Sequence, residues 1–316
     1  MLIPDHFKDA WDIARKNFGH DIHFYAPSIK SFETSEFSNK GNCQFIPVSI
    51  TGSYCELNCG HCSAGILKSM EPAATPDGLI KIAEEHKIRG IAGLLISGGS
   101  DKNGIVPLMD FLPAIKEIKE RLEIKVFVHT GLVDDKLAEG LKDAEADSVL
   151  IDIIGSEETI REVYHLKGIT TEDYEESLKS LQKYCLSISP HIVIGLHYGK
   201  IKGEFNALRI IAKYKPSSLI IVVITPLHNT PMENISLPSI EEVSNIFQQA
   251  RRLLPDTPII LGCERGFGRY KAELDITALK SGFNGIAYPS EGVVEMAREL
   301  GLRSQFSFSC CAMGLK

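Results

Sequence analysis

The stretch FIPVSITGSYCELNCGHCSAG, residues 45–65, joins a short apolar run to a loop that carries three cysteines. Residues 45–50 show little strict alternation of polar and apolar side chains, which favours a strand covered on both faces. Such strands occur in parallel sheets flanked by helices. The run therefore predicts the first strand of an α/β fold, with the cysteines placed directly after its carboxyl end.

Seven more apolar runs of the same kind follow along the chain. They lie at 91–97, 124–130, 148–154, 191–197, 218–225, 257–263 and 285–289. Helical stretches separate them, with N-terminal signals such as Thr75-Pro76 and the Ser239/Glu242 capping-box pattern. Eight strands alternating with helices predict a (β/α)8 barrel of TIM type, complete or nearly complete. An open doubly wound sheet of six or seven strands is the alternative.

The chain divides into three parts around the predicted barrel. Residues 1–42 are expected to form an N-terminal helical extension, because apolar residues recur there at helical spacing. Residues 43–301 span the barrel. Residues 302–316 form a C-terminal tail that carries the paired cysteines Cys310 and Cys311.

Composition excludes several classes of protein. The 316 residues carry a formal net charge of −7 and no cluster of Lys and Arg with interleaved aromatics, which argues against nucleic-acid binding. The N-terminus lacks the features of a secretory signal, and no apolar run reaches the roughly 20 residues that span a bilayer. We therefore expect a soluble, cytoplasmic protein with no membrane contact. In a reducing compartment, its eight cysteines favour metal or redox chemistry over disulfides.

Cys55, Cys59 and Cys62 have the spacing C-x3-C-x2-C, with no fourth cysteine nearby. A closed structural zinc site requires four ligands, and disulfides require an even number of cysteines. Three thiolates from one loop suit three irons of a [4Fe–4S] cluster and leave the fourth iron open to a small molecule. A zinc site completed by a distant ligand, or three unrelated core cysteines, are the alternatives.

The motif and its position after the first strand resemble the radical S-adenosylmethionine (SAM) superfamily. The resemblance implies that SAM binds the open iron and that one-electron reduction cleaves it to methionine and a 5′-deoxyadenosyl radical, which abstracts a substrate hydrogen. An electron donor such as ferredoxin or flavodoxin is implied as a partner.

The same resemblance implies SAM contacts at the ends of later strands. Gly98 and Gly99 match the first two positions of a Gly-Gly-Glu-like element that binds the SAM amino group, with Ser100 in place of the acid and Asp101 next. Asp152, at the end of the fourth strand, is expected to bind a ribose hydroxyl.

The fifth strand, HIVIGLHYGK, is similar to the segment that lines the adenine in this superfamily. Gly195 and His197 are its expected cofactor contacts. His129 and His197 end their strands and are also candidates to face the substrate, although a lone histidine is more often structural.

Among radical SAM proteins the chain is most similar to the biotin synthase and lipoyl synthase group, in which a second cluster donates sulfur. Here Cys263, Cys310 and Cys311 are the candidate ligands of such an auxiliary cluster, and Arg265 is expected to contact it or an anionic substrate group. A mobile tail with incidental thiols and a surface ion pair at Arg265 are the alternatives.

Two cysteines are assigned no ligand role. Cys43, before the first strand, and Cys185, on the helix before the fifth, are expected to be packing residues.

The likeness extends to one subunit of a two-component lipoyl synthase. It implies sulfur insertion into an octanoyl chain on a lipoyl-carrier protein, with a partner radical SAM subunit. A radical SAM isomerase, lyase or maturase without sulfur transfer is the second hypothesis. A non-catalytic iron–sulfur or zinc protein is the third.

Overall fold

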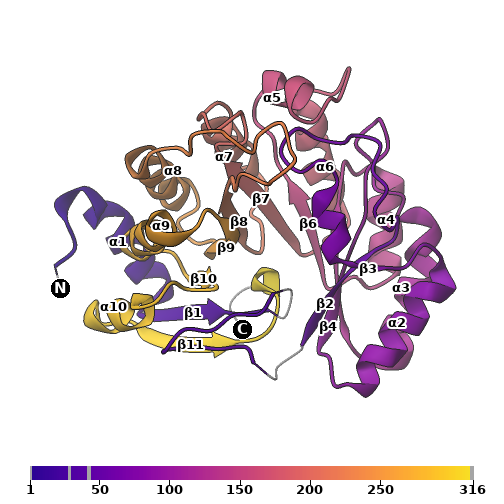
Figure 1. Cartoon of the computed structure of the whole chain (residues 1–316), viewed down its shortest axis with the longest axis horizontal. Coiled ribbons are helices and arrows are strands. Elements are labelled where there is room, and N and C mark those ends of the chain that lie inside the picture. The colour runs from indigo at the N-terminus through magenta and orange to yellow at the C-terminus, as the bar shows by residue number, and fades with distance from the viewer. Residues whose placement is uncertain (1, 28–29, 41–43, 314–316) are drawn as a thin grey trace.

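The computed structural model describes residues 2–27, 30–40 and 44–313, and its strands form one curled, parallel sheet (Figure 1). The order of the eleven strands is β11-β1-β10-β9-β8-β7-β6-β5-β4-β2-β3. Their bounds are β1 (Asp21–Tyr25), β2 (Phe45–Ser49), β3 (Glu71–Pro72), β4 (Gly93–Ser97), β5 (Lys125–Thr130), β6 (Ser148–Asp152), β7 (Ile188–Ile194), β8 (Leu219–Val223), β9 (Ile259–Arg265), β10 (Gly285–Ala287) and β11 (Arg303–Ser307).

Helices cover the convex side of this sheet (Figure 1). They are α1 (Asp5–Phe18), α2 (Pro76–Ile88), α3 (Leu112–Leu122), α4 (Asp135–Asp143), α5 (Glu157–Glu162), α6 (Thr171–Lys183), α7 (Glu204–Ile211), α8 (Ile240–Leu253), α9 (Gly268–Lys280) and α10 (Val293–Glu299), with 3₁₀ turns η1 (Gly65–Ser69), η2 (Met109–Phe111) and η3 (Cys311–Met313). Thr75 and Ser239 cap α2 and α8 as predicted, through their side-chain oxygens. No helix among these is long and apolar enough to cross a membrane.

All eight predicted strands form, as β2 and β4 to β10, and neighbours pair in parallel. Alternate residues of each strand face the helices: Val48, Leu94, Val126 and Val149 are completely buried in that core. The α/β class is therefore confirmed. Among the described residues, however, the sheet has two edges, β3 and β11, so the predicted closure of the barrel by strand pairing is not confirmed.

The last predicted strand, β10, pairs with β1 instead of β2, in the register His23↔Gly285. Sequence reasoning missed β1, a five-residue strand with Asp and His in it. A signal was present: α1 ends at Gly19, which has φ +63°, and the completely buried Ile22 and Phe24 follow in alternation. Helix α1 itself forms within the predicted N-terminal extension.

The C-terminal tail is part of the sheet and then enters its concave side. Strand β11 lies along β1, where Arg303 donates to Asp21 at 2.7 Å. Beyond β11 the chain turns inward, and η3 packs against β6, β9 and β10. The Ser189 hydroxyl on β7 donates to the carbonyl of Ala312 at 3.4 Å, which ties this end of the chain to the barrel interior.

The concave face is layered. Phe45, Phe127 and Leu150 form a small apolar cluster with Cys310 and Ala312 of the tail. Side chains two residues further along a strand share its face. The next positions after Phe127, Leu150 and Ser189 are therefore His129, Asp152 and His191, and this layer of the interior is polar where barrels usually have branched aliphatic residues.

Candidate functional site

The cysteine loop, residues 51–64, leaves the carboxyl end of β2 and is held against the turn after β4 and the C-terminal end of α5. The amide of Gly60 donates to the carbonyl of Val163 at 2.8 Å, and the amide of Glu56 donates to that of Ser100 at 2.9 Å. The carbonyl of Cys59 closes a turn of the loop by accepting from the amides of Cys62 and Ser63. The loop is therefore fixed at the face where barrel enzymes carry their active sites.

Two of its three thiols lie together. Ligand atoms of Cys59, Cys62 and the intervening His61 are all within 4.8 Å of one another. The hydrogen bond between the two thiols lowers the pKa of Cys62 and raises that of Cys59, and the His61 ring adds to the lowering. The Cys55 thiol stands apart, 3.8 Å from the carbonyl oxygen of Ser100. Soft thiol donors from one loop, one of them readily deprotonated, fit an iron–sulfur cluster.

The glycine pair after β4 has a packing role. A Cβ on Gly99 would lie 2.0 Å from the carbonyl oxygen of Tyr54 and 2.6 Å from Cα of Cys55. The close neighbour of Gly99 is thus the backbone of the cysteine loop. Its amide also donates to the Thr51 hydroxyl at 2.7 Å. The expected SAM contacts of Gly98 and Gly99 remain predictions.

The two residues after the glycine pair, Ser100 and Asp101, differ in whether their side chains are free to bind the SAM amino group. The carboxylate of Asp101 accepts from the amides of Asn103 and Ile105, both at 2.9 Å, and so closes its own turn. Ser100 uses its carbonyl oxygen to hold the cysteine loop. Of the two candidates for the SAM amino group, Asp101 is therefore engaged elsewhere, and the contact predicted for Ser100 stays a prediction.

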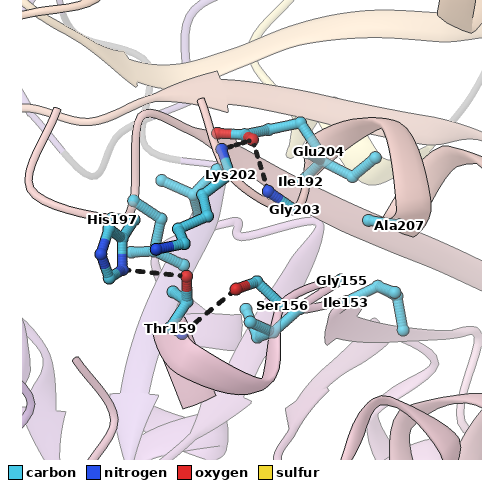
Figure 2. Close-up of a pocket in the computed structure, with 13 residues that line it drawn as sticks. Ile153, Gly155, Ser156, Thr159, Ile192, His197, Lys202, Gly203, Glu204 and Ala207 are labelled. Atoms are coloured by element: carbon cyan, nitrogen blue, oxygen red, sulfur yellow. Dashed lines mark hydrogen bonds between the residues drawn. The ribbon is translucent and has the colours of Figure 1, made fainter. Parts of the chain in front are cut away.

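A small pocket lies between the connections that follow β6 and β7 (Figure 2). Its lining includes Gly155, Ile192 and His197. The His197 ring is buried; its Nδ1 is 3.2 Å from the Thr159 hydroxyl and its Nε2 is 3.4 Å from a carboxylate oxygen of Glu158. His197 is thus held between two side chains of α5, and its predicted cofactor contact is untested by this geometry.

Glu204, at the start of α7, is a residue of this pocket that sequence reasoning missed. Its buried carboxylate accepts from the amide of Gly195 at 2.8 Å. It also accepts from the amides of Lys202 and Gly203, at 2.7 and 2.9 Å (Figure 2). It thereby fixes the turn at Gly195, which has φ +77°. The available signal was an acid that ends the glycine-rich stretch GLHYGKIKGE.

Asp152 lies on the concave face between two imidazoles. Ligand atoms of His129, Asp152 and His191 are all within 4.8 Å of one another. Nε2 of His129 is 3.7 Å from the Asp152 carboxylate, and the rings of His129 and His191 are 5.3 Å apart, at an angle of 67°. Burial, together with the neighbouring His129, lowers the pKa of His191 to about 4. The ribose contact predicted for Asp152 stays a prediction. Sequence reasoning missed His191, because nothing local distinguishes it from the other residues of its strand.

Tyr164, which follows α5, carries an unpartnered polar atom near Asp152 and the cysteine loop. Its hydroxyl is buried and has no hydrogen-bond partner among the described residues. Burial raises its pKa, and the charges of Asp152 and Cys59 raise it further. Its ring centroid is 5.2 Å from that of His61. A hydroxyl left without a partner here suits the polar part of a small-molecule ligand beside the cysteine loop.

A second set of thiols, the tail thiols, consists of Cys263 on β9 with Cys310 and Cys311 of the tail. The Cys311 thiol is hydrogen-bonded to both others. Its hydrogen bond to Cys263 lowers the pKa of Cys263, to which nearby Lys30 also contributes, and raises that of Cys311. The structure thus brings together three residues that sequence reasoning grouped as ligands.

Arg265 lies outside this thiol group, in a completely buried ion pair. Its guanidinium donates to Asp275 at 2.6 Å and to the carbonyls of Gly262, Ala287 and Tyr288. These contacts tie β9 to α9 and β10. The catalytic contact predicted for Arg265 stays a prediction, and the geometry gives this side chain a structural role.

The two cysteines assigned no ligand role can be placed only in part. Cys185 is exposed after α6, so it does not pack as expected. Cys43 lies outside the described residues.

Comparison with known proteins identifies the domain around the cysteine loop. Residues 49–202 match the model of the Radical SAM superfamily. A biotin synthase from Prochlorococcus marinus is 23% identical over 254 residues, which cover 76% of this chain and 73% of the relative. A biotin synthase from Geobacillus kaustophilus is 28% identical over 173 residues, 51% of this chain and 48% of the relative.

Solved structures share the fold at low identity. Methylornithine synthase (PylB) superposes with a TM-score of 0.61 at 13% identity, over 96% of this chain and 91% of the other. The [FeFe]-hydrogenase maturase HydG from Carboxydothermus hydrogenoformans gives 0.62 at 18% identity, over 97% and 72%. These neighbours establish the barrel-like architecture.

Proposed function

We propose that this chain, whose residues 49–202 match the Radical SAM superfamily, is a radical SAM enzyme that uses a [4Fe–4S] cluster and SAM to insert sulfur into an octanoyl chain attached to a carrier protein. In this proposal Cys55, Cys59 and Cys62 hold the SAM-binding cluster, and the tail thiols hold a second cluster that donates sulfur. When reduced, the first cluster supplies the electron that cleaves SAM and yields the radical that abstracts hydrogen.

The residues of this chain have separate tasks. Glu56 and Thr51 fix the cysteine loop on the turn after β4, and the orphan hydroxyl of Tyr164 offers a hydrogen bond to a ligand beside it. The residues proposed to border the bound SAM, at the ends of β4 and β7, are Gly98, Gly99, Ser100, Gly195 and His197.

The grouping of the tail thiols is the observation that carries sulfur insertion. Cysteines 47 residues apart in sequence meet on the concave face, because the chain turns inward after β11. Nothing in sheet packing requires three thiols at one place. Soft sulfur ligands are what an iron–sulfur cluster binds. The similarity to two biotin synthases points in the same direction.

Iron and sulfide counts after anaerobic reconstitution test the proposal. The proteins to compare are the wild type, a loop variant (Cys55, Cys59 and Cys62→Ala), a tail variant (Cys263, Cys310 and Cys311→Ala) and the control Cys185→Ala. We expect about two clusters per chain in the wild type and control, and about one in each triple variant. The tail variant should still form 5′-deoxyadenosine but yield no lipoyl product from octanoylated carrier protein. A loop variant without iron would overturn the second cluster.

A second candidate is radical chemistry without sulfur transfer, as an isomerase, lyase or maturase. The fold similarity to methylornithine synthase over nearly the whole of both chains favours it. It predicts one cluster per chain and unchanged iron in the tail variant. A ferredoxin or flavodoxin as reductant and a partner radical SAM subunit belong to either candidate; a non-catalytic protein would form no 5′-deoxyadenosine at all.

A further inference from the structure

Two imidazoles and one carboxylate converge on the concave face, separate from both sets of thiols. His129, Asp152 and His191 come from the adjacent strands β5, β6 and β7, and the pairing Asp152↔His191 places two of them side by side. Their ligand atoms are all within 4.8 Å of one another. These distances are compatible with binding to one metal ion at bond lengths of about 2 Å.

A hydrogen bond to the backbone orients one of these imidazoles. Nδ1 of His191 is 3.0 Å from the carbonyl oxygen of Ser189. A carbonyl only accepts, so Nδ1 carries the proton and Nε2 presents its lone pair. Histidines that bind metals are typically held in this way by a carbonyl or carboxylate at the other ring nitrogen.

The site is also reachable. The side chains of His129 and Asp152 remain 27% and 31% exposed, although both lie on the inner face of the sheet. An aliphatic barrel interior would leave no such opening. Two nitrogens and one carboxylate oxygen with open positions are the donor set typical of catalytic zinc and of mononuclear iron(II).

We propose that His129, Asp152 and His191 bind one divalent first-row metal ion, of the Zn²⁺ or Fe²⁺ class. The site assigns the Asp152 carboxylate to this metal and not to the SAM ribose. It requires none of the cysteines, so it stands whether or not the tail thiols hold a cluster.

Zinc content of the full-length, cluster-reconstituted chain tests this site. The protein is incubated with Zn²⁺, separated from free metal by gel filtration and analysed for zinc and iron. The variants are Asp152→Asn and His191→Gln, and the control is His228→Gln, an exposed loop histidine whose side chain is 87% accessible. We expect one tightly bound zinc in the wild type and control, and at least about tenfold weaker binding in both variants. Unchanged iron in the variants shows that they are folded.

Cobalt(II) identifies the donor atoms. Added to the same proteins in place of Zn²⁺, and measured as the difference from the same protein without cobalt, it should give the weak visible bands of a nitrogen and oxygen site, absent in Asp152→Asn and His191→Gln. Zinc binding equal in wild type and variants, no zinc in the wild type, or an intense cobalt–thiolate band that appears in the difference spectra of both variants would each overturn the proposal. The sulfur-insertion test depends on iron and product, so either proposal can fail without the other.

Discussion

The cysteine loop and the tail thiols are two ways of bringing three thiols together. In the loop, three cysteines within eight residues are arranged by local turns and by backbone contacts to Val163 and Ser100. The tail thiols depend on the whole topology, because β11 must pair with β1 before the chain reaches β9 from inside. The first set can be recognised from spacing. The second depends on the fold to bring its members together.

The largest expected effect is at the cysteine loop. Cys59→Ala removes a buried thiolate ligand of the proposed cluster, so 5′-deoxyadenosine formation should fall to the level seen without enzyme. Product is measured by chromatography after anaerobic reduction with SAM. Cys185→Ala, at an exposed thiol, should retain full activity. Substantial turnover by Cys59→Ala would contradict the assignment of this loop.

Next in size is the scaffold beside the tail thiols. Arg265→Met leaves the buried carboxylate of Asp275 to Lys271, at 3.3 Å, and to the amide of Ser290, at 2.7 Å. Because the fully buried guanidinium is lost, we expect a loss of about 3 kcal/mol in the free energy of unfolding. The matched control is Arg303→Met, in a more exposed pair with Asp21, with a much smaller expected loss. Urea unfolding of apo-protein measures both. Equal losses would show that the buried pair does not hold β9.

A smaller effect tests how the cysteine loop is seated. Gly99→Ala places a methyl group against the carbonyl of Tyr54, so the loop must shift, at a cost of about 1–3 kcal/mol and with weaker retention of iron. Gly65→Ala adds a methyl group with nothing within 4 Å and should change stability by less than about 0.5 kcal/mol. If Gly99→Ala behaves like Gly65→Ala, the glycine is not there for packing.

The smallest effect is a pH dependence at Lys271, on α9. Burial, together with the nearby Arg265, lowers the pKa of Lys271 to about 8, whereas the unfolded chain keeps its usual value of 10.5. Between these pH values the unfolded chain binds more protons, so the stability of the wild type should rise with pH relative to Lys271→Met. Parallel stability curves for the two proteins across this pH interval would refute the shift.

Much of the fold could be predicted because its strands are apolar runs. The eight runs that form β2 and β4 to β10 are buried between the helices and the interior. Because buried strands consist mainly of apolar residues, these runs could be recognised in the sequence. Strand β11, RSQFS, is an edge strand with mostly exposed or half-exposed residues, so no apolar run marks it. Strand β1 is short, and its polar residues Asp21 and His23 are only half-buried. Closure of the barrel is not confirmed: β1 and β11 extend the sheet beyond β10, and among the described residues β11 does not pair with β2 or β3.

The residues of the candidate site also fall into those with a local sequence signal and those without one. Cys55, Cys59 and Cys62 could be named from spacing, and the tail thiols from Cys263 at the end of a predicted strand and the paired cysteines in the C-terminal tail. His191, Glu204 and Tyr164 could not, because their roles come from what faces them. His191 meets Asp152 through strand register, and Glu204 meets Gly195 by folding back across a turn. The role of a single residue without a local sequence pattern can be assigned only once its neighbours in the folded structure are known.

The pairing of β1 with β10 and β11 has a consequence for biosynthesis. Asp21 and Arg303, which join β1 to β11, are 282 residues apart, so the first strand to leave the ribosome waits for partners made last. Such long-range contacts make folding slow and leave an edge open meanwhile. The cysteine loop is available much earlier in translation. The tail thiols can meet only once β11 has been made, so a cluster proposed to bind them would be inserted later than one in the cysteine loop.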